Sequence, residues 1–369
     1  MHYHIILTEK CNSQCKYCYE KSMKEFDNGL DKKFKFDFSS PESNKIDIKK
    51  LKNFIEKDKD AVIVFYGGEP LLEIEKIKEI IDNIDVPFRM QTNGKLLDQL
   101  PKKYINKIEK ILVSLDGNKD RTDLNRGEGT YDQVMKNIEL IKKNGYKGEL
   151  IARMTICYAD LYDQVLNLVD SGFTSVHWQL DAGFYKFDYN EKEFKMFVQR
   201  YNESLTKLVE YWVSEMNGEN GKVLKFYPFL AIVESLLNKK STKLRCGAGY
   251  LGYAITTDGK IVACPIMNCI EDFYAGHIEK THPSELKKFD VDGECLKCSY
   301  RDLCGGRCLY WNKAQLWPKS GNNLICSTIK HLIDGIKRVM PEINNLINTK
   351  RIKNTDFNYE KYFGPEIIP

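Results

Sequence analysis

Short apolar runs alternate with longer segments of helical periodicity over the first half of the chain. The runs are rich in β-branched and aromatic residues and predict strands at 2–8, 61–66, 88–92, 111–115, 150–156 and 175–180. The segments between them predict amphipathic helices at 47–57, 72–83, 102–107, 131–143 and 161–171. This alternation predicts parallel βαβ units with right-handed crossovers. We therefore expect an α/β fold, a partial (β/α)6 TIM-like barrel.

Four further segments have patterns of their own. Residues 190–216 place large apolar side chains at helical spacing, and we interpret them as a helix packing on the barrel rather than an aromatic platform for substrate. Residues 253–262 indicate a β-hairpin that turns at Asp258-Gly259. A helix pattern begins at residue 327 and gives way to an irregular end. The charged segment 24–44 predicts a surface excursion in the first βα loop, a candidate lid.

Composition narrows the class of protein. Of the 369 residues, 56 are Lys or Arg and 52 are Asp or Glu, so the net charge of +4 gives little support to nucleic acid binding. No apolar stretch approaches the length of a membrane span, and we expect no signal peptide. The 12 cysteines then indicate metal or redox chemistry in a reducing, cytoplasmic compartment rather than disulfides, in a host that is anaerobic.

Three cysteines, Cys11, Cys15 and Cys18, follow the first predicted strand at Cys-x3-Cys-x2-Cys spacing. A closed structural zinc site needs four protein ligands, and an iron–sulfur cube also has four corners. Three local thiolates with no fourth nearby therefore suggest a cube with one iron left open for a small molecule. The alternative is a zinc knuckle or a chance cluster.

Turn-forming sequences follow the next three strands. They are Gly67-Gly68-Glu69-Pro70, Thr92-Asn93-Gly94 and Ser114-Leu115-Asp116-Gly117. Each alone is typical of a strand-to-loop turn. In series they lie at the carboxyl ends of successive strands, where barrel enzymes place their chemistry.

The C-terminal half contains a second cysteine pattern. Cys246 and Cys264 flank the predicted hairpin, and a Cys-x2-Cys-x5-Cys-x3-Cys run and one more cysteine follow. The run comprises Cys295, Cys298, Cys304 and Cys308, and the last cysteine is Cys326. The run alone also fits a zinc ribbon.

Both patterns, with the motifs at the strand ends, resemble the radical S-adenosylmethionine (SAM) superfamily with a C-terminal SPASM domain, found in peptide-modifying enzymes. The resemblance implies that Cys11, Cys15 and Cys18 hold a four-iron–four-sulfur (4Fe-4S) cluster whose open iron is chelated by SAM. One electron then splits SAM into methionine and a 5′-deoxyadenosyl radical. The resemblance also implies that SAM is contacted by Tyr17, Gly67, Gly68, Glu69, Pro70, Asn93 and Ser114. Asp116 is expected to face the substrate.

Polar residues inside the later strands extend this assignment. Arg153 lies between apolar residues of a predicted strand, and we expect it to pair with the SAM carboxylate or with an internal acid. Gln179 is a further candidate for SAM binding. Cys157 is expected to be a small core residue, and none of the six histidines is assigned a catalytic role. Asp123 and Arg126 are expected in a loop, either touching peptide or SAM or solvated.

The SPASM resemblance implies two auxiliary 4Fe-4S clusters, three clusters in all. Cys246, Cys264 and Cys308 would bind the first, and the second would be bound by Cys295, Cys298, Cys304 and Cys326. The first set lacks a fourth thiolate, which leaves two alternatives: Cys269 completes it, or its corner is open to substrate. The implied domains are a radical SAM barrel at 1–189, a helical bridging region at 190–245, SPASM at 246–326 and a C-terminal helix and tail at 327–369.

Two departures from the family pattern bear on the reaction. Sulfatase-maturating members carry an Asp base after the cysteine that matches Cys264, and here Pro265 stands in its place, which disfavours sulfatase maturation. The first predicted strand starts at residue 2, so we expect no leader-peptide recognition domain before the barrel. A peptide would then be bound by barrel and SPASM surfaces, or delivered by a separate recognition partner.

The sequence thus predicts an enzyme that cleaves SAM and abstracts hydrogen from a peptide or protein, forming a cross-link, thioether, epimer or other oxidised residue. Flavodoxin or ferredoxin would serve as electron donor. One alternative is a radical SAM enzyme that modifies a tetrapyrrole or another small cofactor. The other is a non-catalytic zinc or electron-transfer module.

Overall fold

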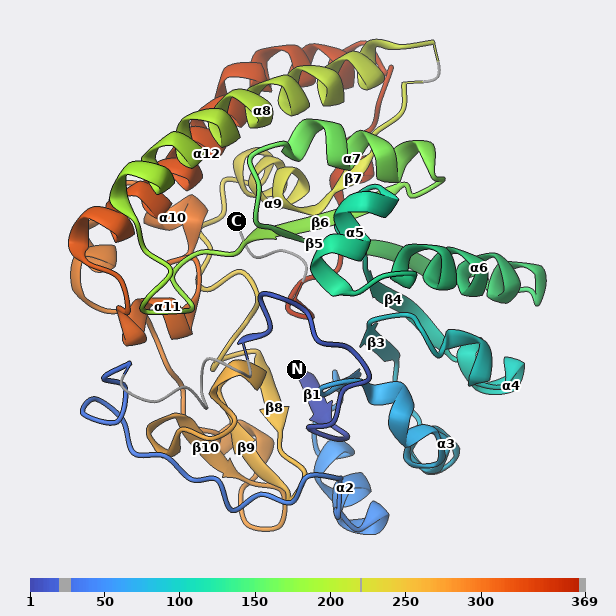
Figure 1. The fold of residues 1–369 in the computed structure, drawn as a ribbon. Coiled ribbons are helices and arrows are strands. Elements are labelled where there is room, and N and C mark those ends of the chain that lie inside the picture. The colour runs from blue at the N-terminus through green and yellow to red at the C-terminus, as the bar shows by residue number, and fades with distance from the viewer. Residues whose placement is uncertain (20–27, 220, 365–369) are drawn as a thin grey trace. The chain divides into compact units, whose positions relative to one another are not determined.

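A computed structural model describes residues 1–19, 28–219 and 221–364 (Figure 1). The chain forms two compact units. Unit 1 comprises Met1–Ala152 and Gly247–Asp290, and unit 2 comprises Arg153–Cys246 and Val291–Pro369. These units divide the chain at other positions than the four domains expected from sequence, whose boundaries stay a prediction. Within the described ranges no helix is long and apolar enough to cross a membrane.

Unit 1 contains a parallel sheet with strand order β8-β1-β2-β3-β4. Its first four strands along the chain are β1 (His2–Ile6), β2 (Val62–Tyr66), β3 (Phe88–Thr92) and β4 (Ile108–Ser114). The helices that alternate with them are α2 (Ile48–Ile55), α3 (Ile74–Asn83), α4 (Lys102–Ile105), α5 (Lys119–Arg126) and α6 (Thr130–Lys143). The strands are buried on both faces, as expected for parallel strands covered by helices. The predicted α/β alternation is confirmed.

The predicted hairpin is also confirmed and joins this sheet. Strand β8 (Gly252–Ile255) pairs in parallel with β1 and antiparallel with β9 (Lys260–Val262), which pairs with β10 (Tyr274–His277). Gly259, in the turn, has a φ of 94°, a conformation that favours glycine. Strand β1 is therefore an interior strand, bordered by β2 on one side and by the hairpin on the other.

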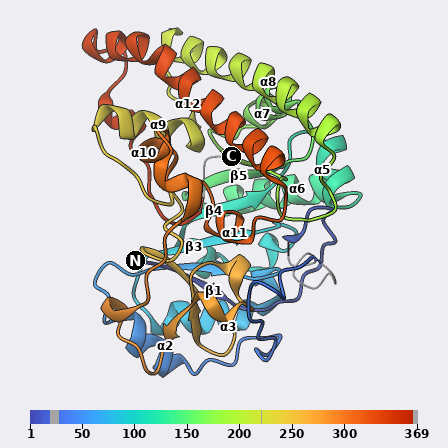
Figure 2. The same ribbon diagram turned by 90° about the vertical axis from the view of Figure 1, so that its left-hand side faces the viewer.

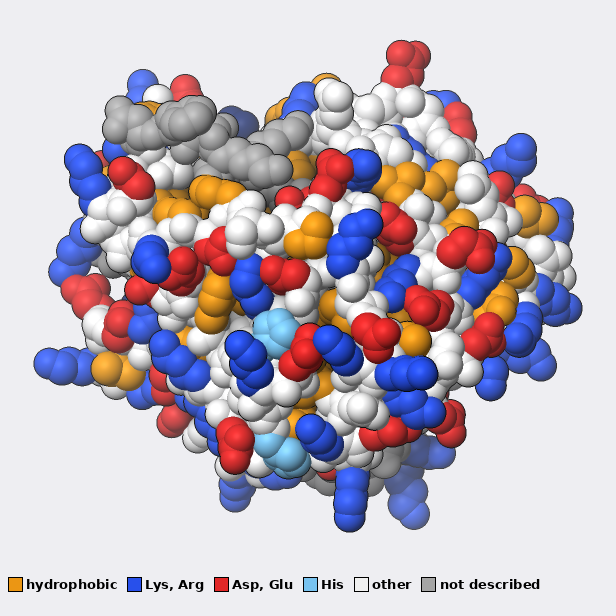
Figure 3. Space-filling model, turned by 90° about the horizontal axis from the view of Figure 1, so that it is seen from below, with side chains coloured by type: hydrophobic (Ala, Val, Ile, Leu, Met, Phe, Trp, Pro, Cys, Tyr) orange, Lys and Arg blue, Asp and Glu red, His pale blue; other side chains and the backbone are white. Residues whose placement is uncertain are grey.

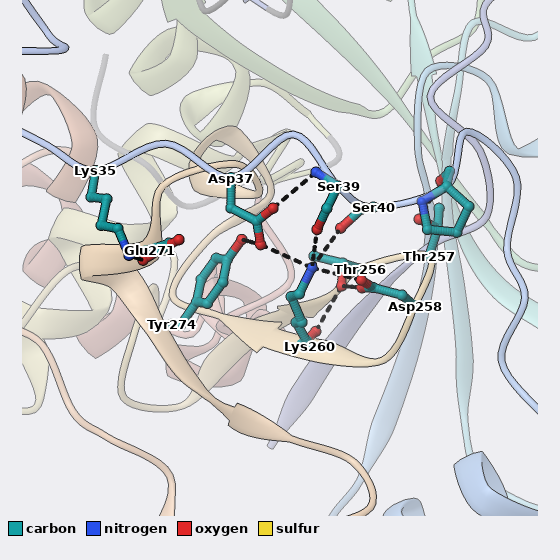
Figure 4. A network of polar contacts seen from close by, with 11 residues as sticks. Lys35, Asp37, Ser39, Ser40, Thr256, Thr257, Asp258, Lys260, Glu271 and Tyr274 are labelled. Carbon is teal, nitrogen blue, oxygen red and sulfur yellow. Dashed lines mark hydrogen bonds and ion pairs between the residues drawn. The ribbon is translucent and has the colours of Figure 1, made fainter.

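The first βα loop is fastened to this hairpin (Figure 4). Asp37 accepts hydrogen bonds from the Ser39 amide and the Tyr274 hydroxyl and pairs with Lys260 at 3.0 Å. Lys260 also pairs with Asp258 at 2.7 Å. Hydrogen bonds from Ser39, followed by the one from Lys260, hold the pKa of Asp37 well below its ordinary range. Of the predicted excursion, residues 24–27 lie outside the described residues.

Unit 2 is mainly helical. Its longest helices, α8 (Glu191–Asn217) and α12 (Lys319–Asn348), lie side by side in both views (Figures 1 and 2). The other elements are α7 (Leu161–Asp170), β6 (Ser175–Leu180), β7 (Lys225–Phe226), α9 (Tyr227–Leu237), α10 (Arg301–Cys304) and α11 (Leu309–Ala314). Strand β5 (Glu149–Ile156) begins in unit 1 and ends in unit 2.

Several predicted boundaries shift by a few residues, and two predictions were wrong by more. Helix α12 starts at Lys319, ahead of the expected residue 327, so Cys326 lies on a helix. Asp123 and Arg126, expected in a loop, lie on α5, which is capped by the Asn118 side chain on the Arg121 amide. The sequence of α5 is mostly charged, so it lacks the apolar periodicity on which the prediction relied.

The surface agrees with the near-balanced charge. On the face drawn in Figure 3, basic and acidic side chains are interspersed. That face presents no extended field of one sign, the feature expected of a nucleic acid interface.

Candidate iron–sulfur and SAM sites

The loop that contains Cys11, Cys15 and Cys18 leaves the carboxyl end of β1 and packs on the loop after β2. The Gly68 amide donates to the Thr8 carbonyl at 2.8 Å, and the Glu69 amide donates to the Lys10 carbonyl at 2.8 Å. A Cβ atom on Gly67 would lie 2.4 Å from the Thr8 oxygen, and one on Gly68 would lie 2.3 Å from the Lys10 oxygen. The two glycines are therefore required by close contact between two backbones of the protein itself.

Glu69 links this contact to the end of β3. Its side chain is fully buried, and its carboxylate accepts from Thr92 Oγ1 and the Asn93 amide, both at 2.7 Å, and from the Leu71 amide at 3.0 Å. Burial raises the pKa of Glu69 to about 7, although the three donors act in the opposite direction. The Glu69 carboxylate thus holds the loops after β2 and β3 together through hydrogen bonds.

Asn93 contacts the cysteine loop directly. Its Nδ2 donates to Asn12 Oδ1 at 2.7 Å and lies 3.9 Å from Cys11 Sγ. Cys11 is exposed, whereas Cys15 and Cys18 are half-buried. The strand-end residue predicted to bind SAM therefore also holds the segment between the first two cysteines.

Tyr17 is held by a buried ion pair from the end of β4 and from α5. The Arg126 guanidinium binds the Asp116 carboxylate through two hydrogen bonds of 2.9 and 3.1 Å, and Asn125 donates to the same carboxylate at 3.2 Å. The Tyr17 hydroxyl donates to it as well, and its ring lies 5.3 Å from the guanidinium carbon. Burial raises the pKa of Tyr17 well above its ordinary value, so its phenol stays neutral.

Both Asp116 oxygens are thus occupied by side chains of this chain, and the carboxylate is 1% exposed. The Lys16 amide donates to the Asn125 carbonyl at 3.0 Å, which ties the cysteine loop to α5 once more. Ser114, the neighbouring candidate, lies at the end of β4 and is half-buried.

In unit 2, Arg153 and Gln179 lie together. Arg153 Nη2 donates to Gln179 Oε1 at 2.9 Å, and both side chains are half-buried. This contact joins β5 to β6. Cys157, which follows β5, lies 3.6 Å from Asp181 Oδ2 beyond β6. It is half-buried rather than a core residue, which corrects that expectation.

The second set of auxiliary cysteines meets at one cavity in unit 2. Four thiols line it, with Trp311 and Ile329 among its apolar walls. The four belong to Cys295, Cys298, Cys304 and Cys326. Asn312 Nδ2 donates to Cys295 Sγ at 3.5 Å, and the amides of Gly306 and Arg307 donate to the Cys304 sulfur.

A buried cation lines the same cavity. Arg307 is 4% exposed, and its Nε and Nη1 atoms have no hydrogen-bond partner among the described residues. Its guanidinium lies 5.3 Å from the Trp311 ring centre. Burial raises the pKa of the Cys326 thiol to about 11, and Arg307 acts in the opposite direction. An iron–sulfur core ligated by the four sulfurs as thiolates would form a negatively charged group beside the guanidinium.

The other auxiliary cysteines are divided between the units. Cys264 and Cys269 belong to unit 1, and Cys246 and Cys308 belong to unit 2. Cys269 is buried, and its carbonyl accepts from the Asp37 amide at 2.9 Å. The choice between Cys269 and an open corner stays a prediction.

Across the part of the chain that the structure describes, no three or more His, Cys, Asp or Glu side chains are placed to ligate a single metal ion. A four-iron cluster instead distributes its thiolates over separate irons. Three thiols on a loop whose carbonyls and side chains are held in place fit the first cluster. Four thiols around a cavity with an unpaired guanidinium fit an auxiliary one.

Sequence reasoning missed several residues that shape these sites. Asn125, Asn312 and Arg307 were not predicted to lie at a site, Thr92 was named only within a turn motif, and Arg126 was expected in a loop. Arg307 had one available signal, since it is a charged residue after two glycines inside a cysteine run. The others lie in ordinary polar contexts.

Comparison with known proteins identifies the family to which the first half of the chain is similar. Residues 5–183 match the Radical SAM superfamily. A cysteine-type anaerobic sulfatase-maturating enzyme of Clostridium perfringens (strain 13) is 25% identical over 370 residues, 91% of this chain and 96% of that protein. The radical SAM cyclopropyl synthase TigE of Paramaledivibacter caminithermalis is 24% identical over 331 residues, 83% of this chain and 67% of that protein.

The fold has a solved counterpart. The structure of native anSMEcpe with bound AdoMet and Cp18Cys peptide matches with a TM-score of 0.69 at 20% identity, over 95% of this chain and 99% of that chain. Radical SAM domains bind a 4Fe-4S cluster and SAM, and the three-cysteine loop lies inside the matched residues. The protein is an enzyme that contains a radical SAM domain at residues 5–183.

Proposed function

We propose that this enzyme cleaves SAM reductively and removes hydrogen from a peptide or protein substrate. The observation that carries the proposal is the cysteine loop at the end of β1, seated on Gly67–Glu69 and fastened by Asn93 and Tyr17. The similarity to a sulfatase-maturating enzyme, to TigE and to a peptide-bound structure supports a peptide as the substrate class.

Cys11, Cys15 and Cys18 would hold the cluster, which together with SAM supplies the 5′-deoxyadenosyl radical. The loops after β2 and β3 would bind the methionine end of SAM, because Glu69 holds their backbones in one arrangement. Arg153, oriented by Gln179, would bind the SAM carboxylate. Asp116 and Arg126 act through Tyr17 and fix the loop rather than contacting substrate.

The enzyme would also hold two auxiliary clusters, one on Cys246, Cys264 and Cys308 and the other on Cys295, Cys298, Cys304 and Cys326. A flavodoxin or ferredoxin would donate electrons. Pro265 opens a 3-10 turn and has no side-chain proton to exchange, so the proposed product is an oxidised or cross-linked residue other than formylglycine.

The test uses protein purified and reconstituted without oxygen. With SAM and dithionite, the wild type is expected to form 5′-deoxyadenosine, and the Cys11→Ala, Cys15→Ala, Cys18→Ala triple variant is expected to form none. SAM titration of Arg153→Leu should show weaker binding than the wild type. A candidate peptide should gain a mass change only with wild-type protein. Undiminished 5′-deoxyadenosine from the triple variant would reject the proposal.

A further inference from the structure

Arg307 has an environment that its own protein neighbours do not explain. It is almost fully buried, yet two of its three guanidinium nitrogens, Nε and Nη1, lack a hydrogen-bond partner within the described residues. Burying a cation without a partner is costly, and native structures rarely do it. The cavity beside it is lined by four cysteine thiols, which as thiolates on an iron–sulfur core would supply the negative charge that the guanidinium lacks.

A second buried arginine in unit 2 provides the contrast. Arg245 is 3% exposed, and its guanidinium donates to the Ala231 carbonyl at 2.7 Å, to the Leu303 carbonyl and to Ser235 Oγ. Arg245 is thus satisfied by the fold and joins α9 to the end of α10. Arg307 is buried to a similar degree, yet two of its guanidinium nitrogens have no such partner among the described residues, so its charge is available to the group that the neighbouring cysteines hold.

The backbone turn that contains Arg307 also has an unusual conformation. Gly305, Gly306 and Arg307 have successive φ values of 73°, 91° and 60°. The last is a left-handed conformation that residues other than glycine rarely adopt. A Cβ atom on Gly306 would lie 2.6 Å from Val291 Cγ1, so the turn is closely packed. The same turn directs the Gly306 and Arg307 amides to the Cys304 sulfur.

We propose that Arg307 sets the reduction potential of the auxiliary cluster held by Cys295, Cys298, Cys304 and Cys326. The inference rests on the proposed function, which places a 4Fe-4S cluster there. When an external donor reduces that cluster by one electron, the cluster gains one negative charge and no proton or bond changes. A fixed positive charge in a poorly solvated cavity stabilises the reduced form more than the oxidised form, and therefore raises the potential.

The other two cations at this cavity should affect the reduction potential less than Arg307, because they are more exposed to solvent. Lys330 is exposed, and Arg301 is half-buried. Water and salt screen an exposed charge, whereas the field of Arg307 acts between Trp311 and Ile329 with little screening. The amides on Cys304 and the Asn312 donor on Cys295 act in the same direction as Arg307, since hydrogen bonds to sulfur also stabilise added negative charge.

The experiment measures the midpoint potential by redox titration followed by electron paramagnetic resonance. It uses the full chain with the Cys11, Cys15 and Cys18 triad replaced by alanine, so that only auxiliary clusters contribute. Arg307→Gln and Arg307→Met remove the charge and keep much of the side-chain length, whereas Arg307→Lys keeps the charge. Lys330→Gln is the matched control, because it removes an exposed cation from the same cavity.

We expect either neutral variant to retain iron and to lower the reduced-to-oxidised ratio at a fixed potential about tenfold, equal to a fall of about 59 mV for one electron. Arg307→Lys and Lys330→Gln should shift the ratio far less. Loss of the cluster from both neutral variants but not from Arg307→Lys would also support a role of the charge.

Three results would overturn the inference: an unchanged midpoint in an iron-loaded neutral variant, an equal shift in Lys330→Gln, or loss of the cluster from all three Arg307 variants. Failure of the proposed function has a different signature. In that case the triad-deleted parent would already lack iron that depends on Cys295 and Cys298, before any change at Arg307.

Discussion

The two thiol groups differ in what surrounds them. The loop of Cys11, Cys15 and Cys18 is held by backbone contacts, by Asn93 and by the Asp116–Arg126 ion pair through Tyr17, and Cys11 is exposed. The cavity of Cys295 and its partners contains a buried cation and amide donors aimed at sulfur. The first arrangement keeps a corner accessible to an incoming ligand. The second places a buried cation and donors where they stabilise negative charge, so the two sites suit different tasks.

The charged residues near the two thiol groups differ in the same way. Arg126 lies close to Tyr17, but Asp116 neutralises it through two hydrogen bonds. The ion pair therefore fixes the loop without projecting a net charge onto it. Arg307 has no such counter-ion among the described residues near the cavity. The sequence alone does not show that Arg126 is neutralised and Arg307 is not; the hydrogen-bond partners in the structure do.

The largest expected effect separates the two sites by iron content and activity. Wild-type protein with three clusters should hold about twelve irons, and each deletion should remove about four. Alanine at Cys11, Cys15 and Cys18 should abolish 5′-deoxyadenosine formation, whereas alanine at Cys295 and Cys298 should leave SAM cleavage measurable. Iron and sulfide analysis beside product chromatography would check this. Zinc in place of iron in the triad-deleted protein would instead favour a structural module.

The next effect tests the buried ion pair. Arg126→Leu should destabilise the protein by about 3–5 kcal/mol, because Asp116 would remain buried without its partner. Chemical denaturation followed by circular dichroism, without oxygen, would measure the change. Lys119→Ala is the control, since Lys119 on the same helix pairs with Asp132 at the surface and its loss should change stability far less. Equal effects of the two substitutions would contradict this account.

A smaller effect tests the backbone contact under the cysteine loop. Gly68→Ala should cost about 1–3 kcal/mol, because its Cβ atom would force two backbone segments apart. It should also weaken retention of the SAM-binding cluster, measured as iron lost on gel filtration. Gly335→Ala is the matched control in α12, where the nearest atom to the new Cβ is Val209 Cγ2 at 3.9 Å. There alanine should be neutral or stabilising, because it favours helix.

The smallest effect concerns Asn93. Asn93→Ala removes the donor to Asn12 and should cost about 0.5–1.5 kcal/mol of stability. If Asn93 acts by holding the loop, cluster retention and SAM affinity should fall together in parallel titrations. A fall in SAM affinity with full cluster retention would instead indicate that Asn93 contacts SAM alone.

Sequence patterns predicted the repeating elements better than the polar contacts. Strands β3 and β6 match the predicted ranges, because turn residues directly after each strand mark its boundary. Helix α5 escaped prediction because its buried residues are polar, Thr122, Asn125 and Arg126, and give no apolar period. The role proposed for Arg307 could not be predicted from the sequence either. It depends on residues 295 and 326, which are distant in sequence and meet Arg307 at one cavity only in the folded chain.

The pairing of β8 with β1 means that the sheet of unit 1 cannot be completed by the first part of the chain alone. His2, His4 and Ile5 are paired with residues that follow position 250, so part of the sheet is supplied from late in the chain. A truncated chain ending near residue 189 would leave the backbone amides and carbonyls along that side of β1 without partners. Such an open edge invites another chain to add on and aggregate. During synthesis, the same edge stays uncovered until the hairpin has emerged from the ribosome.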